Sequence, residues 1–159
     1  GLALAGFAYF SDEVALLDEA TLDVRPFPLG LALKPGTIST IASSLPQAGS
    51  IDAHHRDDGR KVRYLSPGWL GPMVADVPVP ARWLIFPAYS PGARTELRPI
   101  ARSEALRRLL QECTTLPELL DSMRVEQLVR WMRTLACYAL PMSSLDEGVA
   151  LVRHCVASG

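Results

Sequence analysis

Short apolar runs, separated by polar and turn-forming residues, dominate the first third of the chain. Residues 7–10 and 14–17 are apolar segments bounded by acidic residues, a pattern typical of short buried strands rather than of complete helices. An extended segment is expected at 29–34, stopped by Pro-Gly, and a short helix or turn at 37–45. The first six residues are apolar and read as the end of a buried helix.

Turn signals organise the middle of the chain. Asp58-Gly59 predicts a hairpin turn that leads into a strand at 61–65, within a polar region that we otherwise expect to be a solvated, mobile loop. The strongest strand prediction falls on 83–86. Residues 95–98 are expected to pair with that strand across the Ser-Pro-Gly turn at 90–92.

The last third changes to a helical period. Ser103 is expected to cap a helix that runs to about Cys113, and a second helix is predicted at roughly 117–135. A strand is expected at 138–142, and Ser144 to Glu147 match a capping box that opens a last helix. Strands first and helices last predict an α/β or α+β fold in one domain, 1–159, with strands and loops to about residue 100 and mostly helices from 101.

Composition narrows the class of protein. Sixteen basic and seventeen acidic residues give a formal net charge of -1, which offers no general attraction to nucleic acid or to an anionic membrane. The apolar runs are far shorter than the ~20 residues of a membrane span. Three widely spaced cysteines without a CxxC pair predict buried, reduced thiols rather than disulfides or a zinc site. A cytoplasmic protein is expected.

The most informative chemical feature is the acidic pair Asp12-Glu13 between two apolar runs. A strand that ends in adjacent carboxylates can present one to a metal-bound phosphate and the other to an attacking hydroxyl as a proton acceptor. The alternative is a solvated turn, the commoner role of such a pair. Lys34 follows an apolar run and could reach a phosphate, or could simply end a strand at the surface. His54-His55 are adjacent and would point to opposite faces of an extended segment, so a shared metal ion is not expected.

Four segments taken in order resemble the HPr kinase/phosphatase-like family, and more particularly the HPr-kinase-related serine kinases. The acidic segment 12–18 resembles the strand after the family's phosphate-binding loop, and 28–34 resembles a P-L-x-L-x-L-K segment. The segment 83–93 is similar to the family's Phe-Pro strand and turn. The segment 144–149 is similar to its closing S-x-L-D-E-A-V helix.

The resemblance implies a nucleotide-binding α/β core related to phosphoenolpyruvate carboxykinase, with a helical C-terminal section. It implies phosphoryl transfer from ATP, with Mg²⁺, to a serine hydroxyl of a protein or peptide. By position, Asp12 would be the general base or metal-linked acid, Glu13 would help hold Mg²⁺, and Lys34 would contact phosphate. Related kinases form oligomers, so a homo-oligomer is compatible with this assignment.

Two departures from the family pattern change the expectation. The family's G-x-x-x-x-G-K-[ST] loop does not occur in these 159 residues, and Ala88 stands where many relatives have a basic residue after Phe-Pro. The core is therefore expected to be incomplete, with little means of holding ATP, and the chain by itself to have negligible kinase activity. The alternatives are a non-catalytic pseudo-kinase module that binds a peptide or protein, and an unrelated α/β domain that matches by chance.

Overall fold

The computed structural model describes residues 1–33, 35–41, 45–70, 77–112 and 121–159, and these form two compact units, Gly1–Val79 and Pro80–Gly159. Each unit combines strands with helices, so the described residues form a mixed α/β structure. The coarse fold class expected from the sequence is thereby confirmed. The assignment of 1–159 to one HPr-kinase-like domain stays a prediction.

The first unit contains short strands, one α-helix and 3-10 turns within the described residues. In chain order they are β1 (Leu16–Leu17), β2 (Val24–Arg25), β3 (Leu31–Leu33), α1 (Pro35–Ile41), η1 (Pro46–Ser50), β4 (His54–His55), β5 (Lys61–Leu65) and η2 (Pro67–Trp69). Strands β1 and β2 form an antiparallel pair, and β3, β5 and β4 form an antiparallel sheet in that order. The extended segment and short helix expected at 29–45 are confirmed as β3 and α1.

The hairpin between β4 and β5 turns where the sequence predicted it. Gly59 has φ +78°, in the left-handed region that favours glycine, and its N–H donates to the carbonyl of Arg56 at 2.8 Å. The Asp58 side chain accepts from the Arg60 N–H at 2.9 Å. The expectation of a mobile loop around His54-His55 was wrong, because cross-strand pairing with β5 makes the two histidines a short strand, β4.

The N-terminal segment also differs from the prediction. Residues 1–6 form hydrogen-bonded turns rather than the end of a helix, and residues 7–10 contain one bridge residue, Tyr9, rather than a strand. Of the strand expected at 14–17, the last two residues form β1. The apolar pattern marked these segments as partly buried, but a strand also needs a partner in register.

The core of the first unit lies between the β3–β5 pair, α1 and η1. Its buried members are the side chains of Leu33, Ile41, Leu45, Ala48 and Leu65. Leu65 has 1% of its surface exposed and sits opposite Leu31 in the β3–β5 register. The strand β3 is thus anchored by burial immediately before position 34.

The second unit is a three-layer arrangement of helices on both faces of a sheet. Its elements are β6 (Trp83–Tyr89), β7 (Arg98–Pro99), α2 (Arg102–Glu112), α3 (Ser122–Thr134), β8 (Ala136–Met142) and α4 (Leu145–Ser158). The strand order is β6-β8-β7, with β6 parallel and β7 antiparallel to β8. Strands at 83–86 and 138–142 were predicted, and β6 and β8 confirm and extend them. The pairing of 95–98 with 83–86 was wrong, because β8 lies between β6 and β7.

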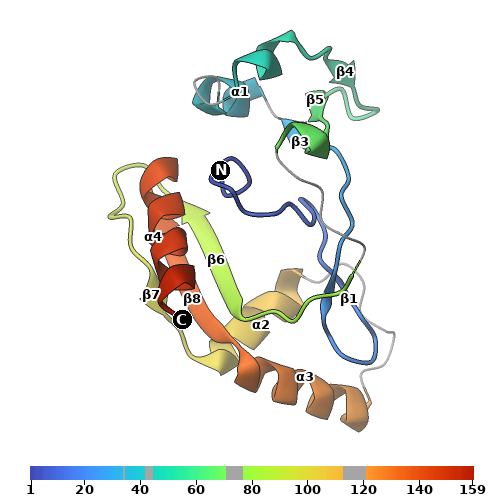
Figure 1. Ribbon diagram of the computed structural model, residues 1–159, viewed down its shortest axis with the longest axis vertical. Coiled ribbons are helices and arrows are strands. Elements are labelled where there is room, and N and C mark those ends of the chain that lie inside the picture. The colour runs from blue at the N-terminus through green and yellow to red at the C-terminus, as the bar shows by residue number, and fades with distance from the viewer. Residues whose placement is uncertain (34, 42–44, 71–76, 113–120) are drawn as a thin grey trace. The chain divides into compact units, whose positions relative to one another are not determined.

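Side chains alternate between the two faces of this sheet, so that one face packs against α2 and α3 and the other against α4. Leu84 and Cys137 are partners in register, and they belong to the core cluster that Ala105 of α2 and Met132 of α3 complete. The opposite face carries Met142, and α4 runs along β8 there (Figure 1). A Cβ at Gly148 of α4 would lie 2.9 Å from the Met142 sulfur, so glycine permits this close approach.

Caps fix the ends of the helices. Ser144 accepts a hydrogen bond from the Glu147 N–H at 3.3 Å, as the capping box predicts, and Asp121 accepts one from the Arg124 N–H at 2.7 Å. Helix α2 begins at Arg102, so Ser103 lies in its first turn instead of capping it. None of the helices in the described ranges combines the length and the hydropathy that a membrane crossing requires.

Two cysteines are visible among the described residues, Cys137 and Cys155, and neither is in a disulfide. Cys137 is buried, and burial raises the pKa of its thiol above the ordinary value, with a smaller opposing effect from Arg102. A buried thiol with a raised pKa is a poor nucleophile, which agrees with the structural role expected for it. Cys113 lies outside the described residues.

Candidate functional site

The acidic pair Asp12-Glu13 lies in an exposed bend of the first unit. The sequence placed the pair at the end of a strand, and this was wrong, because residues 7–10 contain only the bridge residue Tyr9 and the pair ends three residues before β1. Both side chains are nevertheless exposed to solvent. The pair is therefore accessible to a ligand, on a bend rather than on a strand end.

Hydrogen bonds join the residues before the acidic pair to a segment much later in the chain. The Phe27 N–H donates to the carbonyl of Phe10 at 2.8 Å, and the Tyr9 hydroxyl donates to the carbonyl of Leu29 at 2.9 Å. Leu29 lies two residues before β3. The structure thus places the approach to Asp12-Glu13 beside the approach to β3.

Lys34, the third residue predicted for the site, lies outside the described residues. Its described neighbours in sequence are Leu33, which ends β3, and Pro35, which begins α1. The structure consequently brings together the segments that lead to the acidic pair and to position 34, but it does not test the lysine contact itself.

Asp12 and Glu13 are exposed, and Asp12 lies near enough to the Gly1 amino group for its charge to oppose the larger lowering of that group's pKa by burial. Over the described ranges, neither side chain makes a hydrogen bond or an ion pair. An exposed carboxylate without a fixed partner keeps its lone pairs available for a metal ion or for a proton. This availability is the property that the proposed chemistry requires.

Asp18, the next aspartate along the chain, is different in kind. Its carboxylate accepts from the backbone N–H groups of Ala20 and Thr21, both at 3.0 Å, and pairs with the Arg25 guanidinium at 2.5 Å. The hydrogen bond from Arg25, followed by those from the backbone, lowers the pKa of Asp18 from 3.8 to about 2. Asp18 therefore holds the β1–β2 turn, and both of its carboxylate oxygens already accept hydrogen bonds.

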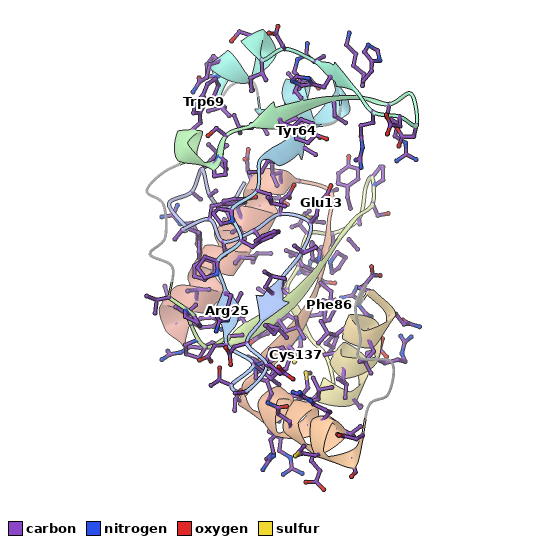
Figure 2. The ribbon with its side chains drawn as sticks, turned by 90° about the vertical axis from the view of Figure 1, so that its right-hand side faces the viewer. Glu13, Arg25, Tyr64, Trp69, Phe86 and Cys137 are labelled. Carbon is purple, nitrogen blue, oxygen red and sulfur yellow. The ribbon has the colours of Figure 1, made fainter. Side chains whose placement is uncertain are left out.

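The same turn contains a strained residue. Leu22 is 8% exposed and has φ +61°, a backbone conformation that is uncommon for a residue other than glycine. Its N–H donates to the carbonyl of Asp18 at 2.9 Å. Figure 2 shows the Glu13 and Arg25 side chains well apart, so Arg25 serves this turn and not the acidic pair.

Tyr9 responds to the charge on Asp12. The pKa of the Tyr9 hydroxyl is raised above its ordinary value, mainly by burial and further by the negative charge of Asp12. The phenol therefore stays protonated at neutral pH and remains a hydrogen-bond donor to Leu29. Sequence reasoning did not identify Tyr9, because a contact between residues 9 and 29 leaves no local pattern in one sequence.

Ser11, between Phe10 and the acidic pair, was also missed. Its hydroxyl oxygen is buried and has no hydrogen-bond partner among the described residues. Leaving such a group unsatisfied costs about 1–3 kcal/mol, so a polar ligand or water at this point of the bend would be stabilised by it.

The fit of a metal ion to this segment follows from the type of its oxygens. No group of three or more His, Cys, Asp or Glu side chains that could hold a metal occurs in the part of the chain described. Mg²⁺ commonly binds through only one or two carboxylates, with water and substrate phosphates completing six ligands. The exposed pair Asp12-Glu13 fits this mode and does not fit a site made entirely of protein ligands.

Comparisons with known proteins identify no relative. No protein-family model matches the chain, and neither a search of curated proteins nor a search of solved structures finds a match.

Proposed function

We propose that this chain is part of an ATP-dependent phosphotransferase of the HPr-kinase-like type, which phosphorylates a serine hydroxyl on a protein or peptide, and that the chain alone is inactive. The observation that carries the proposal is the exposed acidic pair Asp12-Glu13, whose carboxylates make no hydrogen bond or ion pair within the described residues. The ordered resemblance of four sequence segments supports the same assignment.

The roles of the residues follow from the chemistry of phosphoryl transfer. Asp12 accepts the proton of the serine hydroxyl as the new oxygen–phosphorus bond forms and the bond to the leaving ADP oxygen breaks. Glu13 helps to hold Mg²⁺, which neutralises charge on the phosphates when it is bound. Lys34 supplies a positive charge to the phosphate.

The proposal also explains why isolated activity is not expected. Phosphoryl transfer depends on positioning and on charge stabilisation, and backbone N–H groups of a glycine-rich loop commonly supply both. The 159 residues contain no such loop. That observation favours a second candidate function, in which a pseudo-kinase module binds a peptide or protein without nucleotide.

The test compares the complete gene product with this chain, in matched variants. Asp12→Asn in an active complete product should lower the phosphotransfer rate at least 100-fold, the usual minimum effect of losing a general base. Asp57→Asn, at another exposed aspartate of the same unit, makes the same charge change and should leave the rate within about twofold.

Each alternative has a distinct result. Robust phosphotransfer by residues 1–159 alone, abolished by Asp12→Asn, would overturn the prediction of inactivity. A complete product that binds no MgATP in calorimetry would reject the kinase assignment and leave the peptide-binding module. Equal rates for Asp12→Asn and Asp57→Asn would remove Asp12 from the reaction.

A further inference from the structure

Two hydrogen bonds hold the segment that precedes the acidic pair. The phenol of the half-buried Tyr9 donates to Leu29 at 2.9 Å, and the carbonyl of the adjacent residue, Phe10, accepts from Phe27 at 2.8 Å. The first bond is made by a side chain and the second by backbone. The two segments are therefore joined at two consecutive residues, 9 and 10.

These bonds lie close to the acidic pair along the chain. Asp12 lies two residues after Phe10, in a bend. The carboxylates of Asp12 and Glu13 make no hydrogen bond or ion pair within the described ranges. The other segment joined by the two hydrogen bonds continues from Leu29 into β3, which is anchored by the buried core. A strand with a buried core residue, Leu33, is thereby connected to the segment that leads into the bend.

The Tyr9 hydroxyl is unsuited to direct catalysis. It is already committed as a donor to the Leu29 carbonyl, and burial together with the charge of Asp12 raises its pKa, which keeps it protonated. Its available role is to set where Asp12 lies. This distinguishes a residue that orients the base from one that takes part in proton transfer.

We propose that Tyr9 is a positioning residue, whose hydroxyl bond to Leu29 fixes the bend that carries Asp12 and Glu13 against the segment leading into β3. The inference rests on the proposed function for its consequence in catalysis. The placement of Asp12 by Tyr9 is a separate, structural claim, and it can be tested without any enzymatic activity.

The variant Tyr9→Phe keeps the ring and removes only the hydroxyl. Loss of a neutral hydrogen bond is expected to speed amide exchange at Phe27 by roughly 2- to 12-fold. It should also lower kcat of the complete product by a similar factor, with KM for MgATP little changed. The matched control is Tyr64→Phe, which removes the hydroxyl of an exposed tyrosine on β5 and should change neither quantity.

A titration of the Tyr9 ring by NMR separates positioning from a merely structural role. In Asp12→Asn the pKa of Tyr9 should fall, because a nearby negative charge has been removed. An unchanged Tyr9 pKa, or unchanged Phe27 exchange in Tyr9→Phe, would overturn the proposal. Absence of phosphotransfer in the wild-type complete product would reject the proposed function instead, and the two NMR readouts would still decide the position of Asp12.

Discussion

Leu65 offers the most direct test of the packing that supports the candidate site. Its side chain is 1% exposed and lies in the core that β3, α1 and η1 share. In register it pairs with Leu31, the first residue of β3. Truncation to alanine therefore removes apolar contacts directly behind the strand to which the acidic segment is connected.

The expected cost follows from the nearly complete burial of Leu65. A buried Leu→Ala change loses the transfer free energy of the removed carbons and leaves a cavity, together about 2–5 kcal/mol. A native domain is commonly stable by only about 5–15 kcal/mol, so this loss is a large fraction of the total. Because each 1.4 kcal/mol is a factor of ten, opening of β5 should become roughly 30-fold to several thousand-fold more frequent.

Amide hydrogen exchange measured by NMR reports this opening at individual strands, which suits a chain with two compact units. Amides of β3 and β5 in Leu65→Ala should exchange faster by the factor given above. Leu29→Ala is the matched control, since that side chain is 53% exposed, and it should change exchange less than about threefold. Equal effects of the two substitutions would refute the packing of this core.

Two further predictions concern polar contacts. Ser144→Ala should destabilise α4 by about 1 kcal/mol in urea unfolding, through loss of the cap to Glu147, whereas the exposed Ser122→Ala should have little effect. The lowered pKa of Asp18 means that its ion pair stabilises the fold fully above pH ~4 and ceases to do so as pH falls toward about 2. Asp18→Asn should flatten thermal stability across that pH range, and added salt should weaken the wild-type dependence, because Arg25 is 52% exposed; a slope identical to that of the wild type would contradict this reading.

Features that the sequence predicted correctly are those that depend on neighbouring residues. Asp58-Gly59 specifies a hairpin because glycine accepts a positive φ, and Ser144 specifies a helix start because its hydroxyl reaches the N–H three residues on. The long apolar strand β6 was found for the same reason, since its residue types favour a strand wherever its partner lies.

Pairing between distant segments could not be predicted from these patterns. Strand β6 pairs with β8, so that Trp83 faces Ala136, and the intervening residues include two helices. The local turn at 90–92 instead suggested pairing with 95–98. A turn makes a hairpin available, but the parallel crossover places the buried Cys137 and Leu140 of β8 beside β6 and packs Leu84 into the core with α2 and α3, and this burial favours the observed topology.

The candidate site shows the same difference between residue type, which the sequence shows, and contacts that form only in the folded chain. Residue types identified Asp12-Glu13 as the acidic pair. Both residues are exposed, which agrees with a role in binding a ligand rather than in stabilising the fold. The element that carries them was wrong, and Tyr9 and Ser11 were missed, because their contacts and burial arise only in the folded chain.

Aspartates 12 and 18 lie six residues apart, yet their surroundings assign them opposite roles. The Asp18 carboxylate accepts hydrogen bonds from Ala20, Thr21 and Arg25. The lowered pKa of Asp18 shows that these bonds stabilise its charged form in the fold. Asp12 has no such bonds within the described residues, although a hydrogen-bonded tyrosine sits close enough to respond to its charge. Substitution should separate the two roles: loss of Asp18 acts on stability, and loss of Asp12 should act on ligand binding or turnover with stability unchanged. The pairing of a structural carboxylate with an uncommitted one is the physical reason for placing the candidate chemistry at the bend and not at the turn.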